Sequence, residues 1–371
     1  MADRRPVRLL VIERPGVARL ADDDESAPAG GQFRLETLYT GLSAGTELTF
    51  YKGTNPSLHA AWDGRLGVFR HDRPATGFPV RAPGYMEVGR VSETSTEAVA
   101  VGDLVAMAYG HKTGHTVDPA VDRFVPLPHD LDPVLGVYVA HMGPICANGL
   151  LHAAADAAGP AALQLGDGVR GRLVLVTGAG VVGLLVALLA RHHGAAEVLV
   201  ADATPERLAV ARALGLDAVD DGDGAAWRAV KERWRRDPND CGADVVFQCR
   251  GRTAALAGAL RSLRPQGTVI DLAFYQGGAP DLALGEEFHH NGLIIRCAQI
   301  GRVPRGMAHL WDRHRLAAET VQLLRANGSA IREHLVTDLV PLSDAPALLA
   351  DLAARRRHIL QAVFACPAAT A

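Results

Sequence analysis

Apolar and polar residues partly alternate in short runs over the first hundred residues of the chain. The runs RPVRLLVI, FRLETLYTGLSAG, PGYMEVGRVSE and VAVGDLVAMA are separated by Gly, Pro and Asp, the residues that punctuate strands. This pattern predicts a β-rich, barrel-like unit over residues 5–105. A long segment, residues 52–82, interrupts the strands, and a loop of that length in a compact domain is usually functional or mobile.

The pattern changes at about Leu131 to Ala- and Leu-rich helical runs. From Arg172 to about Ile300, strand-like and helix-like runs alternate, and the tail then continues through a helix to a last strand, HILQAVF. Such alternation predicts βαβ units built around a parallel sheet.

The sharpest motif follows the apolar run LVLV, which has the composition of a strand buried on both faces. The run leads directly into GAGVVG, residues 178–183, and then into an amphipathic helix. In this context a G-x-G-x-x-G pattern is the dinucleotide-binding fingerprint, because its glycines allow a tight turn, close approach of a pyrophosphate and helix–strand packing. A glycine-rich turn by itself also serves plain strand-to-helix packing.

The acidic residue that completes the fingerprint is Asp202, which ends the next strand, EVLVA, and lies 19 residues beyond Gly183. A carboxylate at this place binds the hydroxyls of the adenosine ribose and repels a 2′-phosphate. We therefore expect NAD as the cofactor. The nearby Arg207 leaves NADP open as an alternative.

Composition and charge narrow the class of protein further. The 371 residues carry 38 basic and 41 acidic side chains, so no net field recruits nucleic acid or an anionic membrane. The five cysteines are scattered and odd in number, which favours reduced thiols. The N-terminal residues lack the apolar core of a signal peptide, and the longest apolar run, VVGLLVALLA, is half a membrane span. We expect a cytoplasmic protein with no nucleic-acid or membrane partner.

In the order of these parts, including the segment VGDLVA, the chain resembles the medium-chain dehydrogenase/reductase superfamily over residues 6–364. The resemblance implies an α/β fold in which a Rossmann doubly wound parallel sheet is inserted into a GroES-like β-rich catalytic domain. The expected divisions are residues 1–145, 146–300 and 301–371. It also implies a small-molecule substrate, bound in a cleft between the two domains.

Carried over position by position, the resemblance implies three groups of cofactor contacts. The contacts at the pyrophosphate are Gly178, Gly180, Val181, Val182 and Gly183. The contacts at the adenosine ribose are Asp202 and Arg207. The contacts at the nicotinamide side are Cys249, Gly251, Leu272, Ala273 and residues 297–299, which end at Gln299. In this family the strand corresponding to LIIRCAQ commonly pairs across a dimer, so a homodimer is also implied.

Zinc ligands of the family are largely missing from the chain. The first ligand position holds Ser43 or Ala44, the second holds Tyr85, and Cys146 alone matches the third. Residues 104–130 contain none of the four cysteines of a structural zinc lobe. Together with GLSAGTELTFYKG and PGYMEVGRV, this is similar to the zinc-lacking branch that includes bacteriochlorophyllide dehydrogenases. We expect no metal. The alternative is an unconventional site of His111 and His115 with Cys146 or Glu87.

Without zinc, side chains must take the hydroxyl proton of an alcohol and stabilise its oxygen. Tyr85 occupies a former ligand position, and Thr46 and Glu47 stand where the family has a hydroxyl residue at the substrate oxygen and an acid behind it. Further acid–base candidates are Glu87, His111 and His141. The alternative is structural: Tyr85 is simply packed with its hydroxyl satisfied, and Glu47 is paired locally, as such residues commonly are.

The resulting hypothesis is a zinc-independent NAD(P)-dependent dehydrogenase that interconverts a secondary alcohol and a ketone. The expected substrate class is a polyol, a cyclitol or a secondary-metabolite hydroxyl. Two alternatives stay open: an NADPH-dependent enone or quinone reductase, and a nucleotide-binding protein without turnover.

Overall fold

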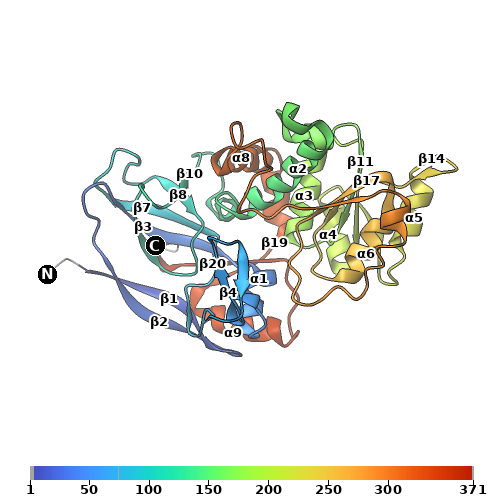
Figure 1. Cartoon of the computed structure of the whole chain (residues 1–371). Helices are drawn as coiled ribbons and strands as arrows, with labels where there is room; N and C mark the ends of the chain where they lie inside the picture. Colours follow the sequence, from blue (N-terminus) through green and yellow to red (C-terminus); the bar gives the residue numbers. More distant parts are fainter. Residues whose placement is uncertain (1–3, 74, 370–371) are drawn as a thin grey trace. The chain divides into compact units, whose positions relative to one another are not determined.

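The computed structural model describes residues 4–73 and 75–369, and its chain divides into two compact units. Unit 1 comprises residues 1–141 and 336–371, and unit 2 comprises residues 142–335. Figure 1 shows that unit 1 is rich in strands, whereas unit 2 surrounds a parallel sheet with helices.

Unit 1 is built on a mixed sheet in which β3 pairs with β7, β9 and β20. The path β10-β8-β7-β3-β20-β19 consists of Phe124–Pro126, Leu104–Met107, Glu87–Thr94, Phe33–Gly41, Gln361–Ala365 and Val336–Pro341, with β9 at Gly114–Val117. A second sheet, β2-β1-β6, consists of Val17–Ser26, Arg4–Arg14 and Val80–Arg81. The predicted β-rich unit is therefore confirmed.

Two of the core clusters of unit 1 show how its layers are held together. One lies on the main sheet around Phe33, Leu35 and Met107. The other joins strands β1 and β20 to helices α1 (Ala44–Tyr51) and α9 (Ala345–Ala353). Burial of these apolar faces is the main source of stability for such a layered unit.

The segment over residues 52–82 has structure of its own rather than forming one open loop. Its central part is the hairpin of β4 (Ala61–Asp63) and β5 (Val68–Arg70), and the rings of Trp62 and Phe69 meet edge to face on it.

Unit 2 contains a six-stranded sheet in which every neighbouring pair is parallel. The order β13-β12-β11-β16-β17-β18 corresponds to Asp217–Asp220, Glu197–Asp202, Leu173–Thr177, Ala243–Gln248, Leu263–Asp271 and Ile294–Cys297. The chain order reverses between β11 and β16. In an open parallel sheet, ligands bind outside the carboxyl ends of the strands at such a switch point.

The helices of unit 2 supply the covering layers. They are α2 (Met142–Ala158), α3 (Val181–His192), α4 (Pro205–Ala213), α5 (Ala226–Arg233), α6 (Thr253–Ser262), α7 (Glu287–His290) and α8 (Arg313–Ala330), and a short hairpin joins β14 (Arg235–Asp237) to β15 (Asp240–Cys241). The predicted parallel sheet and its helical connections are confirmed.

The return to unit 1 begins later than we expected. We expected the return at residue 301, but residues 301–335 lie in unit 2 and the chain returns to unit 1 at Val336. Helix α8 belongs to unit 2 because it packs on α2, where a Cβ on Gly143 would lie 2.1 Å from the Thr320 side chain. Arg315 also donates to the Leu163 carbonyl at 2.7 Å. The apolar pattern of a helix does not say which layer it covers.

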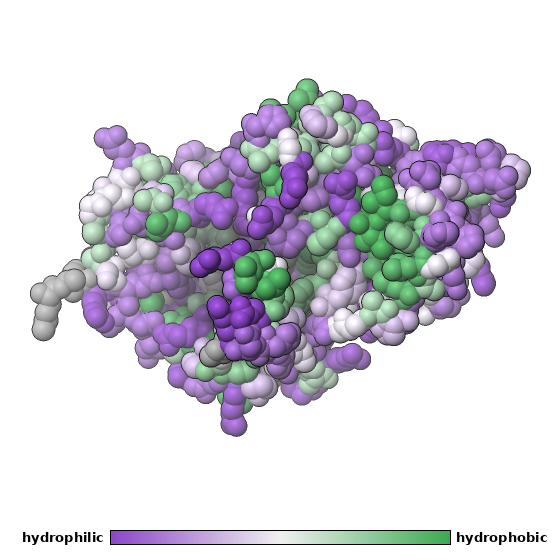
Figure 2. Space-filling model, in the orientation of Figure 1, coloured by the Kyte–Doolittle hydropathy of each residue, from purple (hydrophilic) through white to green (hydrophobic). Residues whose placement is uncertain are grey.

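The visible surface mixes polar and hydrophobic side chains. On the face in Figure 2, hydrophobic side chains gather in separate small groups among polar ones. Within the described residues, no helix is both long and apolar enough to cross a membrane. All five cysteines are free.

Candidate functional site

The glycine-rich turn of unit 2 has the backbone that the sequence motif predicts. Gly178 follows β11 with a φ of +102°, a conformation that side chains rarely adopt. A Cβ on Gly183 would lie 1.7 Å from the Gly178 carbonyl oxygen, so only glycine lets α3 start this close to the strand. Gly180 precedes α3 without a side-chain cap, and a Cβ there would meet nothing within 4 Å.

This turn fits a dinucleotide. The first residues of α3, Val181 and Val182, follow an uncapped helix start, so backbone N–H groups remain for a phosphate. The open space above Gly180 is where a pyrophosphate would approach the backbone.

Asp202 ties the turn to the end of β12. Its side chain is 2 % exposed, and its two oxygens accept from Ala179 N and Thr204 N, each at 2.8 Å. An ionised carboxylate offers about four acceptor positions, so these two bonds do not fill it. Arg207 stands on α4 near this end, and its buried Nε has no hydrogen-bond partner in the described chain.

The carboxyl ends of β16 and β17 form a polar network beside the turn. Gln248 is fully buried; it accepts from the Thr177 hydroxyl and donates to the Arg250 carbonyl at 2.7 Å and to Tyr275 Oη at 3.2 Å. Tyr275 in turn donates to Asp271 at 3.2 Å. Burial raises the pKa of the Asp271 carboxyl, although the Ala273 N–H that it accepts works in the opposite direction.

The residues assigned to the nicotinamide side lie at the same ends of the sheet. Cys249 N donates to the Thr177 carbonyl and Leu272 N to the Gln248 carbonyl, both at 2.9 Å. A Cβ on Gly251 would lie 2.5 Å from the Phe274 carbonyl oxygen, so the chains that leave β16 and β17 run close together. Gln299 follows β18, and its side chain accepts from Gly301 N at 2.6 Å.

A second polar group lies in unit 1, where we expected the chemistry of the alcohol oxygen. The hydroxyls of Ser43 and Tyr85 are hydrogen-bonded to each other, and the His141 ring packs on the Tyr85 ring with centroids 4.6 Å apart. Thr46 is half-buried one turn further on, in α1. Ser43, Tyr85 and His141, which are far apart in the sequence, thus meet in one place. We call them the hydroxyl site.

A buried pair stands behind the hydroxyl site. Glu47 accepts from Ser43 N at 2.7 Å through one oxygen and contacts His111 Nε2 at 2.7 Å through the other. The other ring nitrogen of His111 lies 2.7 Å from the Thr40 hydroxyl. The side chains of Glu47 and His111 are both 1 % exposed. Glu47 therefore fixes the backbone of Ser43 and is fully engaged itself.

Glu87 lies apart from this group, within the sheet. It is fully buried, one oxygen accepts from the Thr37 hydroxyl, and the other has no hydrogen-bond partner among the described residues. Burial raises the pKa of its carboxyl above the usual range. A fully buried acid of this kind is not positioned to bind a substrate.

The residues present do not fit a zinc ion. Among residues 4–73 and 75–369, no group of three or more His, Cys, Asp or Glu side chains could hold a metal. The two histidines of the alternative site have separate partners, because His111 pairs with Glu47 whereas His115 lies against Lys112 and Glu25. Cys146 is buried in unit 2, where its thiol points to the Val182 carbonyl at 3.6 Å and burial raises its pKa.

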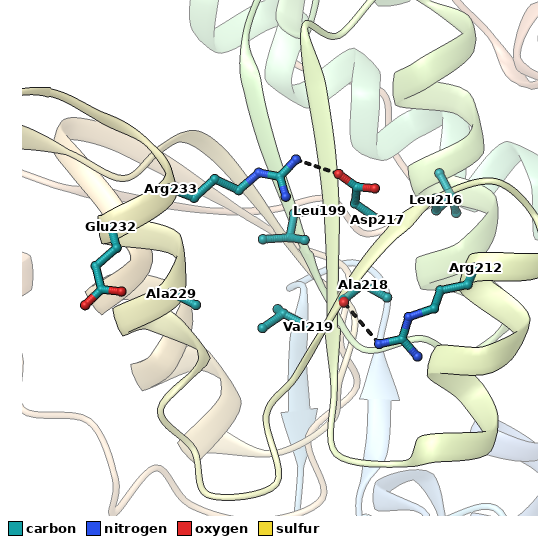
Figure 3. Close-up of a pocket in the computed structure, with 9 residues that line it drawn as sticks. All are labelled: Leu199, Arg212, Leu216, Asp217, Ala218, Val219, Ala229, Glu232 and Arg233. Atoms are coloured by element: carbon teal, nitrogen blue, oxygen red, sulfur yellow. Dashed lines mark hydrogen bonds and ion pairs between the residues drawn. The ribbon is translucent and has the colours of Figure 1, made fainter.

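A cavity of 610 Å³ lies elsewhere in unit 2, along the sheet edge formed by β13 (Figure 3). Helices α4 and α5 flank it, Arg233 pairs with Asp217 across one end, and Arg212 donates to the Ala218 carbonyl at 3.2 Å. These arginines cover the polar groups of the edge strand. None of the residues that we assigned to the cofactor lines this cavity.

Sequence reasoning missed two parts of these sites. Ser43 entered only as a former zinc position, although its hydroxyl is the partner of Tyr85. Gln248 was not noticed, although a polar residue that ends the buried run ADVVFQ is a usable signal for a network at the sheet edge.

Comparisons with known proteins give a consistent result. The zinc-binding dehydrogenase family model matches residues 181–311. D-guloside 3-dehydrogenase of Shigella flexneri is 26 % identical over 349 residues, which cover 92 % of this chain and 94 % of that protein.

Among solved structures, 2R,3R-butanediol dehydrogenase from Bacillus subtilis has a TM-score of 0.72 at 18 % identity, covering 97 % of this chain and 99 % of the other. A Sinorhizobium meliloti protein described as a zinc-binding dehydrogenase, solved with NADP, has a TM-score of 0.70 at 18 % identity with the same coverage. These structures share the fold. The family model and the sequence relatives support the assignment of the chain to the medium-chain dehydrogenase/reductase superfamily, as an enzyme of its alcohol dehydrogenase/reductase type.

Proposed function

We propose that this enzyme is a zinc-independent, NAD-dependent dehydrogenase that converts a secondary alcohol of a polyol, cyclitol or glycoside to a ketone. The coarser activity, oxidoreduction of a secondary alcohol, is supported by its relatives. The observation that carries the proposal is the hydrogen-bonded pair of Ser43 and Tyr85, which stands in place of two zinc ligands.

The hydroxyl site can handle the proton that an alcohol loses on oxidation. The nicotinamide ring, when bound, supplies the hydride acceptor. Tyr85 accepts the alcohol proton while its own proton moves to Ser43, and Ser43 gives up its hydroxyl proton in turn, because a hydroxyl both donates and accepts. His141 is the titratable group beside the pair and passes the proton on. Thr46 supplies a further hydroxyl for the substrate oxygen.

Glu47 and His111 act on this chemistry indirectly. Glu47 is linked to Ser43 through the backbone N–H, which cannot relay a proton, so it is a positioning residue and not a general base. Its bond to His111 keeps the carboxylate in place where it is closed to solvent.

NAD is the cofactor that the adenosine end favours. Asp202 stands at the end of β12, where its charge opposes a 2′-phosphate. The second candidate function, an NADPH-dependent enone or quinone reductase, has one observation in its favour: Arg207 carries a buried Nε without a hydrogen-bond partner in the described chain, and an arginine accommodates a phosphate well.

The test combines cofactor binding with turnover. Purified protein is titrated with NADH and NADPH, and reduction of NAD is followed with a panel of polyols, cyclitols and glycosides. We expect NADH to bind more tightly and at least one alcohol to be oxidised. Tighter NADPH binding with turnover of enones alone would establish the reductase instead.

We also propose a homodimer formed through β18, the edge strand of the unit 2 sheet. Ile294 on this strand is 43 % exposed, and an open apolar edge is a template for pairing with a second copy. Sedimentation analysis of the Ile294→Lys variant is the test; a dimer unchanged by this substitution would place the interface elsewhere.

A further inference from the structure

Asn148 is a fully buried polar residue on the otherwise largely apolar helix α2, and no step of the proposed reaction uses it. Its Nδ2 lies 3.4 Å from the Ala298 carbonyl oxygen, 3.3 Å from that of Gln299 and 3.2 Å from that of Arg302. One side chain thus contacts three carbonyls of the loop that follows β18. We call residues 298–302 the carbonyl loop.

The orientation of the Asn148 amide is set by this loop alone. Its Oδ1 is buried and has no hydrogen-bond partner among the described residues. A flipped amide would turn Oδ1 toward three carbonyl oxygens, which repel it, so the assignment of Nδ2 to the loop follows from the contacts. Burying an unpaired amide oxygen is unfavourable, and an apolar side chain of similar volume would avoid that cost. An amide at this position is therefore explained by its hydrogen bonds to the carbonyl loop.

The carbonyl loop lies at the functional edge of the sheet. It follows the carboxyl end of β18, three strands from the glycine turn after β11, or about 14 Å at the usual strand spacing. A dinucleotide binds across the switch point of such a sheet, one half on each side. Because Asp202 ends β12, the adenosine half belongs to β11, β12 and β13, and the nicotinamide half belongs to β16, β17 and β18.

The same helix braces the neighbouring strand end. Next to Asn148, a Cβ on Gly149 would lie 2.9 Å from the Leu272 side chain, so α2 packs closely against the residue that follows β17. The N–H of Ala298 donates to the Asp271 carbonyl at 2.9 Å, so the first residue of the carbonyl loop is also tied to the end of β17.

We propose that Asn148 is a positioning residue that holds the carbonyl loop in the conformation that receives the nicotinamide half of the cofactor. The proposal rests on the proposed use of a nicotinamide dinucleotide. It predicts a selective defect, because the adenosine half binds on the other side of the switch point and does not need the carbonyl loop.

The test compares NADH with ADP-ribose, which keeps the adenosine and pyrophosphate but lacks the nicotinamide. Both are titrated by calorimetry into the full-length wild-type protein and into Asn148→Asp, which points a carboxylate oxygen at the three carbonyls. Asn148→Ser shortens the side chain without adding charge and serves if the aspartate variant does not fold. Asn327→Asp, on α8, is the matched control, because the Asn327 amide contacts the Leu323 carbonyl of its own helix.

We expect the Asn148 variants to bind NADH about tenfold more weakly, which corresponds to about 1.4 kcal/mol, because the hydrogen bonds to the carbonyl loop are lost. They should bind ADP-ribose within about twofold of wild type. The Asn327 variant should bind both ligands as wild type does. Folded Asn148 variants that keep full NADH affinity, or that lose both ligands equally, would overturn the inference. Wild-type protein that binds neither ligand would instead overturn the proposed function.

Discussion

In the proposed reaction the glycine turn of unit 2 binds the cofactor and the hydroxyl site of unit 1 handles the alcohol proton, and the two are encoded in different ways. The turn is continuous in sequence: strand, glycines and helix occupy residues 173–192, and Asp202 ends the next strand. The hydroxyl site and the pair behind it draw on residues 40–47, Tyr85, His111 and His141, which only the folded sheet brings together. The spacing of the glycines is enough to predict a binding role for the turn. A catalytic role for the hydroxyl site is indicated only by the contacts between its side chains.

Substitution of Tyr85 by Phe should have the largest effect. Removing the phenol hydroxyl removes the proton acceptor, and loss of such a group lowers kcat by about 10²–10⁴-fold. NADH affinity should be unchanged, because the glycine turn is intact. Steady-state kinetics and NADH titration measure the two effects separately. Tyr109→Phe is the control, since Tyr109 donates to Asp122 elsewhere in unit 1; full activity of Tyr85→Phe would refute the assigned role.

Gly183→Ala should weaken cofactor binding at the glycine turn of unit 2. The new Cβ would lie 1.7 Å from the Gly178 carbonyl oxygen, so the turn must open, at a cost of about 1–3 kcal/mol. We expect NADH affinity to fall about tenfold or more, together with stability. Gly258→Ala, in α6 with nothing within 4 Å of its Cβ, should leave binding unchanged. Equal NADH affinity in both variants would contradict the assignment of the turn to the cofactor.

Glu47→Ala tests whether the buried pair positions the hydroxyl site. Removing the Glu47 carboxylate leaves His111 Nε2 and Ser43 N without their partner, and breaking a buried pair costs about 3 kcal/mol. Urea unfolding measures this loss, and kcat should fall with little change in NADH affinity. Glu47→Gln keeps an acceptor for Ser43 N and should recover most of the activity. If Gln were as damaging as Ala, the charge and not the positioning would matter.

The smallest expected effect is a change in acid stability when Glu25 is substituted. Glu25 lies in unit 1, where it contacts Lys112 and His115 and not the hydroxyl site. Burial would raise the pKa of its carboxyl, but hydrogen bonds to His115 and Lys112 outweigh burial and hold the pKa at about 2. Because this is below the usual 4.5, the ionised carboxylate stabilises the fold above about pH 4.5, and the contribution is lost as the pH falls toward 2. Urea unfolding at several pH values should show a smaller acid loss in Glu25→Gln, with unchanged kcat at neutral pH. An identical acid profile would contradict the assignment.

The two regions also show how far sequence can lead. Alternating patterns and the glycine spacing were enough to predict the main sheet of each unit and the glycine turn, because these depend on neighbours in the chain. The Tyr85–Ser43 contact was out of reach, since it depends on the position of α1 relative to the residues before β7. Glu87 shows the same limit: its neighbours in sequence suggest acid–base chemistry, but the pleat of β7 points its side chain into the sheet interior. For α8, the apolar pattern gave the helix but not the unit that it covers.

The central claim is that the hydroxyl site does the work that zinc does elsewhere in the superfamily. The most direct measurement is the rate of NAD reduction by protein exhaustively treated with a zinc chelator, using an alcohol that the untreated protein oxidises. We predict the same rate before and after treatment, with no increase when zinc is added back. A rate that disappears with the chelator and returns with zinc would contradict the account.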